Sequence, residues 1–183
     1  QRAGRRDRAR VESDDGGYLQ RLAQHRLSSV STHSPFDTQD LAHARVTSRE
    51  MVERALARIA DPAGEGARAF VKAYTDTARA EADHSDRLRR AGIVRSAVDG
   101  LPVSVKDLFD VAGDVTRAGS KILSTAAPAQ RDATAVARLR AAGAVIIGGT
   151  NMVEFASGVI GATPHYGTPK KPFDRAQGRI PGG

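Results

Sequence analysis

The sequence of 183 residues contains no cysteine, so it can form no disulfide bond, no thiolate metal site and no cysteine nucleophile. It also has no apolar run close to the roughly 18 residues that a membrane-spanning helix needs. The arginine-rich head has the charge of the start of a signal peptide, but acidic residues follow where an apolar stretch should be. We therefore expect a cytoplasmic protein without a membrane partner.

Aromatic side chains are scarce, at 4% of the residues. This matters because the formal net charge of +7 raises the question of a nucleic-acid partner. Within residues 1–10, five arginines face one aspartate, so a net +4 belongs to this head alone. With few aromatic rings available for base stacking, we expect no specific nucleic-acid partner. Residues 1–35 are interpreted as a flexible basic lead-in, and residues 36–183 as the folded part.

The remainder has the composition of a globular protein, with 40% hydrophobic and 27% charged residues in the whole chain. Order is expected to begin near Thr47, which with Glu50 has the form of a capping box at a helix start, and Pro62 ends that helix. Periodicity then predicts, in order, a strand at 70–74, a helix over 76–90, a strand at 103–106, a helix over 132–142 capped by Asp132, and a buried parallel strand at 144–151. This alternation predicts an α/β fold whose sheet is covered by helices.

Lys106 ends the predicted strand at 103–106 and is followed by Asp107. Periodicity alone favours a surface lysine that forms an ion pair at the strand end. Ser104 lies on the same strand face, but its spacing from Lys106 matches no Ser-Lys arrangement that would make the two a catalytic pair. The five histidines have no zinc spacing, so no metal site is predicted. On these grounds alone, Lys106 is an ordinary strand-end lysine.

Five sequence blocks change this interpretation of Lys106. They are GLPVSVKD at 100–107, TRAGS at 116–120, DATAVARLRAAGAVIIGGTNMVEFA at 132–156, PHYGTP at 164–169 and PFDRAQGRIPGG at 172–183. In order and spacing the blocks resemble the amidase signature family, and with the upstream helix the resemblance covers about residues 47–183. It implies the N-terminal part of the amidase-signature fold, with a mixed central sheet covered by helices.

The resemblance also implies a Ser, cis-Ser, Lys triad, which hydrolyses a carboxamide to a carboxylate and ammonia or an amine through an acyl-serine intermediate. Lys106 matches the lysine of the triad and would be the base, because burial disfavours an ammonium and makes a neutral amine available to activate a serine. The two serines of the family lie in a run that begins at the PGG matched by residues 181–183. We therefore expect residues 36–183 to be the N-terminal portion of an amidase domain, truncated before the catalytic serines and inactive alone.

The resemblance implies a small-molecule amide as the substrate and implies no cofactor and no metal. It does not identify the substrate-binding residues, and it leaves open whether the protein forms a homo-oligomer. Gly119 and Ser120 fall in a loop that the resemblance places near the active site, whereas His165 belongs to a block that looks structural. Thr163 and Lys171 depart from the family pattern, since many relatives have asparagine there. The departure at Lys171 concerns the substrate side of the prediction, not the family.

Two alternative functions stay open beside the stand-alone amidase. The first is an amidotransferase A-type subunit of the same family, which delivers ammonia to an aminoacyl-tRNA together with partner subunits. The second is a truncated gene product without catalytic function, which would leave an exposed sheet edge and an uncovered apolar face.

Overall fold

A computed structural model of the chain describes residues 38–171 and 178–182, so the lead-in predicted for residues 1–35 lies outside the described residues. The helices are α2 (Thr38–Ala42), α3 (Ser48–Ala60), α4 (Gly66–Ala69), α5 (Thr75–Arg90) and α6 (Thr134–Ala141), with the 3-10 turns η1 (Ile122–Thr125) and η2 (Glu154–Ala156). The strands β1 (Phe70–Ala73), β2 (Pro102–Lys106) and β3 (Val145–Thr150) form a sheet in the order β1-β3-β2. Because β3 pairs antiparallel with β1 and parallel with β2, the sheet is mixed, as the resemblance implies.

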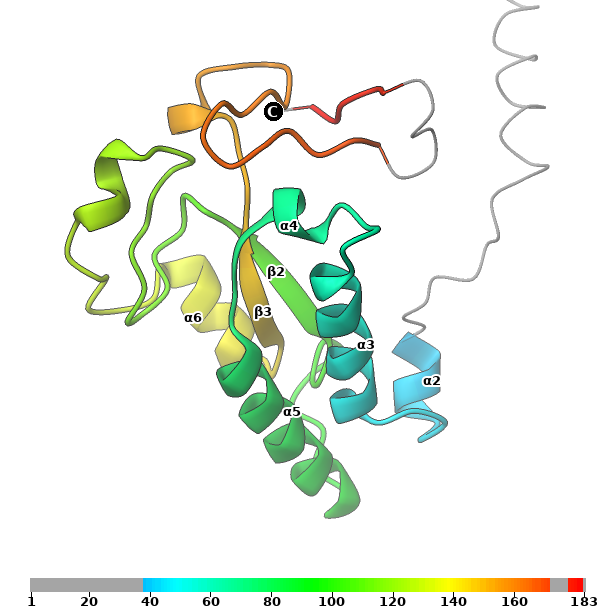
Figure 1. Ribbon diagram of the computed structural model, residues 1–183. Helices are drawn as coiled ribbons and strands as arrows, with labels where there is room; N and C mark the ends of the chain where they lie inside the picture. The colour runs from blue at the N-terminus through cyan, green and yellow to red at the C-terminus, as the bar shows by residue number, and fades with distance from the viewer. Residues whose placement is uncertain (1–37, 172–177, 183) are drawn as a thin grey trace, which may run out of the picture. The chain divides into compact units, whose positions relative to one another are not determined.

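Strand β3 is the centre of the sheet and is covered by helices on both faces (Figure 1). Val145 and Ile147 pack with α3 and α5, whereas Ile146 points to the other face and packs with Val136 of α6. The three β3 side chains are at most 7% exposed. Burial on both faces explains why β3 is a continuous apolar run, and it confirms the prediction of a buried parallel strand.

The start of α3 is fixed by two caps. The predicted capping box is confirmed, because Thr47 accepts the N–H of Glu50 and the Glu50 carboxylate accepts the N–H of Thr47 at 2.8 Å. A second cap comes from α5, where the buried Asp86 carboxylate accepts the N–H groups of Ser48 at 2.8 Å and Arg49 at 3.0 Å. A carboxylate at this position also interacts favourably with the helix dipole. The two caps together hold the start of α3 against α5.

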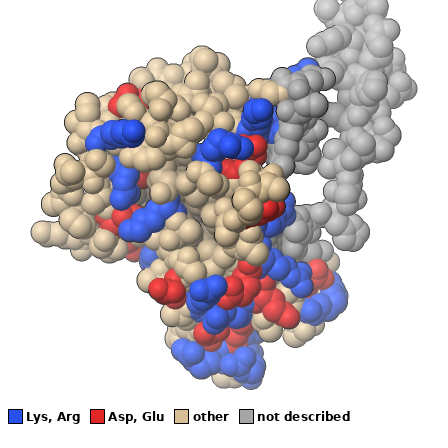
Figure 2. All heavy atoms as spheres, viewed as in Figure 1, with Lys and Arg blue, Asp and Glu red and all other residues tan. Residues whose placement is uncertain are grey.

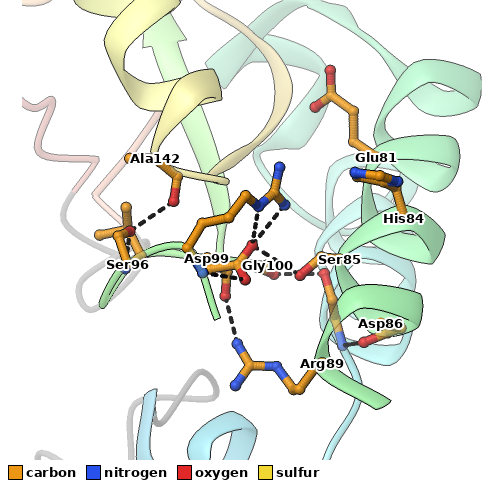
Figure 3. Close-up of polar contacts among 12 residues, drawn as sticks. Glu81, His84, Ser85, Asp86, Arg89, Ser96, Asp99, Gly100 and Ala142 are labelled. Atoms are coloured by element: carbon orange, nitrogen blue, oxygen red, sulfur yellow. Dashed lines mark hydrogen bonds and ion pairs between the residues drawn. The ribbon is translucent and has the colours of Figure 1, made fainter. Parts of the chain in front are cut away.

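The amino ends of β2 and β3 are closed by a buried polar network around Asp99 (Figure 3). Asp99 is 1% exposed and accepts hydrogen bonds from Ser85 Oγ at 3.1 Å and from the Arg95 guanidinium at 2.6 Å. Ser96 Oγ donates to the carbonyl oxygen of Ala142 at 2.7 Å, which joins the loop before β2 to the end of α6. Asp99 and Ser96 therefore link α5, the loop before β2 and the end of α6 at this end of the sheet.

One prediction about the first ordered element is wrong, because α2 precedes Thr47. Leu41 of α2 is only 2% exposed and packs with Met51 of α3. A helix of five residues is too short to show a repeating apolar period, which is why periodicity did not indicate it. None of the helices in the described ranges combines the length and the apolar character that crossing a bilayer requires.

The predicted cap of α6 is also wrong. Ala133 occupies the N-cap position, and no side chain caps the helix. Asp132 instead accepts the N–H of Ala112 at 2.8 Å and forms an ion pair with Arg140 at 3.1 Å. The carboxylate is thus engaged by a distant loop and by the far end of α6, and these long-range partners displace the local cap.

Candidate active site

Lys106 is the last residue of β2 and lies beside Thr150, the last residue of β3. The two strands are parallel, and the N–H of Asp107 donates to the carbonyl oxygen of Thr150 at 3.0 Å. Both chains therefore leave the sheet at the same edge. In open α/β sheets, the crevice outside the carboxyl ends of parallel strands is the usual place for a ligand site.

A cavity of about 150 Å³ opens at this edge and is lined by Lys106. Its walls include Thr150 and Asn151 from the end of β3, Thr163 from a later loop, and the distant segment 181–182. Among the described residues that line it, Lys106 alone is ionisable. The fold thus brings a single amine, neutral side chains and a segment from 75 positions later in the chain into one small space.

The predicted strand-end ion pair between Lys106 and Asp107 does not form. Asp107 is 6% exposed, and its carboxylate accepts the N–H of Gly119 at 3.0 Å. Burial raises the pKa of the Asp107 carboxyl group, while hydrogen bonds from the backbone of Gly119 and Arg117 oppose that shift. Within residues 38–171 and 178–182, the Lys106 ammonium has no hydrogen-bond or ion-pair partner. Lys106 therefore does not form the surface ion pair that periodicity alone favours.

The hydroxyl groups near Lys106 are already engaged. Thr150 Oγ1 donates to the carbonyl oxygen of Val105 at 3.3 Å, and Thr163 Oγ1 donates to the carbonyl oxygen of Gly167. Ser104 is exposed and is not part of the cavity wall. Within the described part of the chain, the cavity thus contains a candidate base but no free hydroxyl group that the base could activate.

Ser120 and His165 lie just outside the cavity and meet at Glu154. Ser120 is fully buried, its Oγ donates to Glu154 Oε1 at 2.6 Å, and His165 Nε2 lies 3.1 Å from the same oxygen. The Ser120 hydrogen bond lowers the pKa of Glu154; burial opposes this shift and His165 adds to it. Because the carboxylate stands between the serine and the histidine, the imidazole cannot take the Ser120 proton directly. The cluster therefore joins two loops, which fits the structural interpretation of His165.

Asn151 is the residue at this edge that sequence reasoning missed. Its side-chain nitrogen lies 2.8–3.0 Å from acceptors on Arg68, Thr163 and Gly167, and its side-chain oxygen accepts the N–H of Met152 at 2.9 Å. The available signal was that the chain has a single asparagine, placed immediately after a buried strand. No group of three or more side chains suited to hold a metal ion occurs in the ranges that the structure describes.

Comparison with known proteins identifies a family whose members this chain resembles. The sequence model of the family described as Amidase matches residues 50–183. The chain is 46% identical over 145 residues to the AtzE subunit of the 1-carboxybiuret hydrolase of Pseudomonas sp. (strain ADP). It is 45% identical over 143 residues to the A subunit of the glutamyl-tRNA(Gln) amidotransferase of Anaeromyxobacter dehalogenans (strain 2CP-C). These alignments cover 79% and 78% of the chain.

A solved structure supports the same assignment. The native peptide amidase from Stenotrophomonas maltophilia is similar to this chain with a TM-score of 0.65 and 33% sequence identity, over 74% of the chain. The matched region spans 31% of the AtzE subunit, 28% of the amidotransferase subunit, and 28% of the peptide amidase. The chain thus corresponds to less than a third of each relative.

Proposed function

Since the chain belongs to the amidase family, we propose that Lys106 is the base of an amidase that hydrolyses a carboxamide to a carboxylate and ammonia or an amine. The proposed substrate is a small molecule, because the described part of the cavity is about 150 Å³ and neutral apart from Lys106. The names of the relatives support this reaction class, since two of the three are a peptide amidase and a hydrolase subunit.

The observation that carries this proposal is the shared cavity of Lys106 and residues 181–182. The N–H of Gly161 donates to the carbonyl oxygen of Pro181 at 2.9 Å, so a loop of the cavity wall holds this segment in place. The family resemblance places the first residues of the serine run at this segment. A serine that follows it would therefore enter the space into which Lys106 opens.

The proposed reaction begins when the nucleophilic serine attacks the amide carbonyl carbon and its proton passes through the middle serine to the neutral Lys106 amine. The resulting ammonium then returns the proton to the leaving nitrogen as the C–N bond breaks, which releases ammonia or an amine. Water next attacks the acyl-serine, and Lys106 accepts and returns a proton in the same way. Within the part of the chain that the structure describes, no carboxylate pairs with Lys106, which supports its role as the base.

A chimera tests the proposal. Residues 50–182 would replace the matching segment of the full-length AtzE subunit, and hydrolysis by the purified chimera would be compared with hydrolysis by its Lys106→Ala variant. We expect Lys106→Ala to lower kcat by about 10²–10⁴-fold, the usual contribution of a positioned base. Lys121→Ala is the matched control, because Lys121 is an exposed lysine outside the cavity. A chimera that folds and keeps its kcat after Lys106→Ala would show that the base is another group.

The amidotransferase A-type subunit is the second candidate function. It is favoured by the 45% identity to the glutamyl-tRNA(Gln) amidotransferase, which nearly equals the 46% identity to the hydrolase. Copurification of the chain with the other subunits of an amidotransferase, or with tRNA, would support this function. A chain that binds none of them while the hydrolase chimera is active would argue for the amidase.

A further inference from the structure

Asn151 is the first residue after β3, and its side chain joins parts of the chain that are distant in sequence. Its Nδ2 atom donates to the carbonyl oxygen of Arg68 at 2.9 Å and to that of Gly167 at 2.8 Å, and its backbone N–H donates to the carbonyl oxygen of Ala69 at 2.9 Å. Arg68 and Ala69 end α4 just before β1. One carboxamide thus connects the α4–β1 corner to the loop that contains Gly167.

The loop that Asn151 holds is a wall of the Lys106 cavity. Gly161 and Thr163 of segment 161–167 line the cavity, and Asn151 Nδ2 also lies 3.0 Å from Thr163 Oγ1. At the other end of the segment, Gly161 N–H binds the carbonyl oxygen of Pro181. A continuous set of contacts therefore runs from the end of β3, through segment 161–167, to Pro181.

From this set of contacts we propose that Asn151 is a positioning residue, which holds segment 161–167 and, through it, Pro181 at their distance from Lys106. The mechanistic meaning of this placement rests on the proposed amidase function; the placement itself does not.

Only a carboxamide supplies both the N–H donors and the oxygen acceptor that the contacts at position 151 require. The two Nδ2 hydrogens serve three acceptors within 3.0 Å, so one hydrogen is shared, and Oδ1 accepts the N–H of Met152. Aspartate lacks the donors, and leucine of similar volume lacks both donors and acceptor. Loss of the amide removes the Asn151 donor from the carbonyl group of Arg68 and leaves the carbonyl group of Gly167 with Thr163 Oγ1 alone, so the α4–β1 corner and segment 161–167 are no longer joined by this side chain.

The test uses the 183-residue chain and its lysine amines. Competitive acetylation with acetic anhydride over a range of pH, read by mass spectrometry, gives the reactivity of Lys106 relative to the exposed Lys121 in the same molecule. In Asn151→Leu we expect this ratio to rise at least about fivefold, and the amide hydrogens of segment 161–167 to exchange at least about tenfold faster, because the wall is released. Thr163→Val removes the Asn151–Thr163 link and the hydrogen bond from Thr163 to Gly167, but leaves Asn151 bound to Arg68 and Gly167, so it should change both quantities in the same direction by less.

Ser96→Ala is the matched control, because Ser96 also bridges two backbone groups, the Ala142 carbonyl at 2.7 Å and the Val98 N–H at 3.1 Å, at the opposite end of the sheet. It should leave the Lys106 ratio unchanged. An unchanged ratio and exchange rate in both Asn151→Leu and Thr163→Val would overturn the inference, and so would an equal change in Ser96→Ala. If Asn151→Leu does not fold, the comparison of Thr163→Val with Ser96→Ala decides.

The hydrolase chimera separates this inference from the proposed function. With Asn151→Leu in the chimera we expect kcat to fall more than KM changes, because the substitution displaces reacting groups and removes no proposed substrate contact. If the chimera keeps its activity after Lys106→Ala while acetylation of the 183-residue chain still responds to Asn151→Leu, the proposed function fails and the positioning role stands. If the chimera loses activity after Lys106→Ala but acetylation of Lys106 does not respond to Asn151→Leu, the positioning role fails and the proposed function stands.

Discussion

Asp99 and Lys106 lie at opposite ends of the sheet and differ in their ion-pair partners. Other charged groups are paired on both sides, as Asp114 is with Lys72 near the carboxyl end of β3. At the amino ends of β2 and β3, the buried Asp99 is paired with Arg95, and nearby Glu81 is paired with Arg140. At the carboxyl ends, Lys106 faces a cavity and has no partner among the residues that the structure describes. In Figure 2, charges of both signs are densest in the lower part of the view, whereas the upper part is mainly tan with scattered blue and red side chains. Paired buried charges maintain the fold, whereas an unpaired amine in a cavity is a candidate for chemistry.

Among the described residues, positive φ angles outside glycine are concentrated, but not confined, near the carboxyl ends of the strands. Around the amino ends of the strands, positive φ angles fall on glycines, with 81° at Gly100 and 93° at Gly143, and on Ala44 between α2 and α3, with 54°. Near the carboxyl ends they also fall on Ala118, Phe155 and Ala156, with φ of 50°, 52° and 56°. Side chains in this region carry a steric cost that glycine avoids, and such cost is tolerated where the surrounding contacts fix the geometry. Ala118 N–H donates to the carbonyl oxygen of Asp107, and Phe155 N–H donates to that of Ala118, so these residues lie in loops that leave the sheet on the Lys106 side.

The largest expected effect comes from breaking the amino end with Asp99→Ala. The substitution leaves the partly buried Arg95 without the carboxylate oxygen to which two of its guanidinium nitrogens donate, and it removes the acceptor of Ser85 Oγ. Breaking a buried pair in this way should lower the free energy of unfolding by about 3–5 kcal/mol, measured by urea denaturation. Lys106 acetylation relative to Lys121 should stay the same under conditions where the variant is folded, because Asp99 lies at the other end of the sheet.

Asp76→Ala is the control for this prediction. Asp76 is fully exposed and lies 4.0 Å from Arg79, so its removal should change the free energy of unfolding by less than about 0.5 kcal/mol. A loss of stability in Asp99→Ala no larger than in Asp76→Ala would contradict the assignment of the amino end as the stabilising end.

Much of the fold is local and was predicted from the sequence for that reason. The capping box at Thr47, the strand at Phe70–Ala73 and the buried run of β3 each depend on residues close together in the chain. Gly92 stops α5 with a φ of 78°, as its position after the last periodic residue indicates. The order of the blocks also indicated the family, which the comparison confirms over residues 50–183.

The contacts that the sequence did not predict join residues far apart in the chain. Asp86 caps α3 from 38 positions away, Asn151 binds the backbone of Arg68 83 positions away, and Ser120 binds Glu154 34 positions away. No spacing rule connects such pairs, because their meeting depends on how the helices and loops pack. The absence of a Lys106–Asp107 ion pair has the same origin, since the Asp107 carboxylate is engaged by the N–H of Gly119, 12 positions later.

A smaller effect is expected from Gly119→Ala at the carboxyl end. Gly119 has a φ of 69°, and a Cβ atom there would lie 2.5 Å from the carbonyl oxygen of Met152. Strain and overpacking together should lower the free energy of unfolding by about 2–4 kcal/mol in urea denaturation. Gly113 is the matched control, because its φ is 83° but nothing lies near its Cβ position, so Gly113→Ala should cost only about 1–2 kcal/mol. Equal costs would show that the two loops are not packed against each other as described.

The smallest effect concerns the pH dependence of the Ser120–Glu154–His165 cluster. The Ser120 hydrogen bond lowers the pKa of Glu154 from its ordinary 4.5, so the charged carboxylate stabilises the folded state above that pH. This stabilisation is lost as the pH falls below 4.5 through the lowered pKa, because the unfolded state takes up the proton first. The difference in unfolding free energy between the wild type and Glu154→Gln, measured in urea, should therefore be largest above that pH and shrink below it. Burial raises the pKa of the nearby Asp107, so charging this group costs stability and its own contribution changes with pH in the opposite sense. A Glu154→Gln difference that grows as the pH falls would mean that Glu154 is not the hydrogen-bonded carboxylate that joins the two loops.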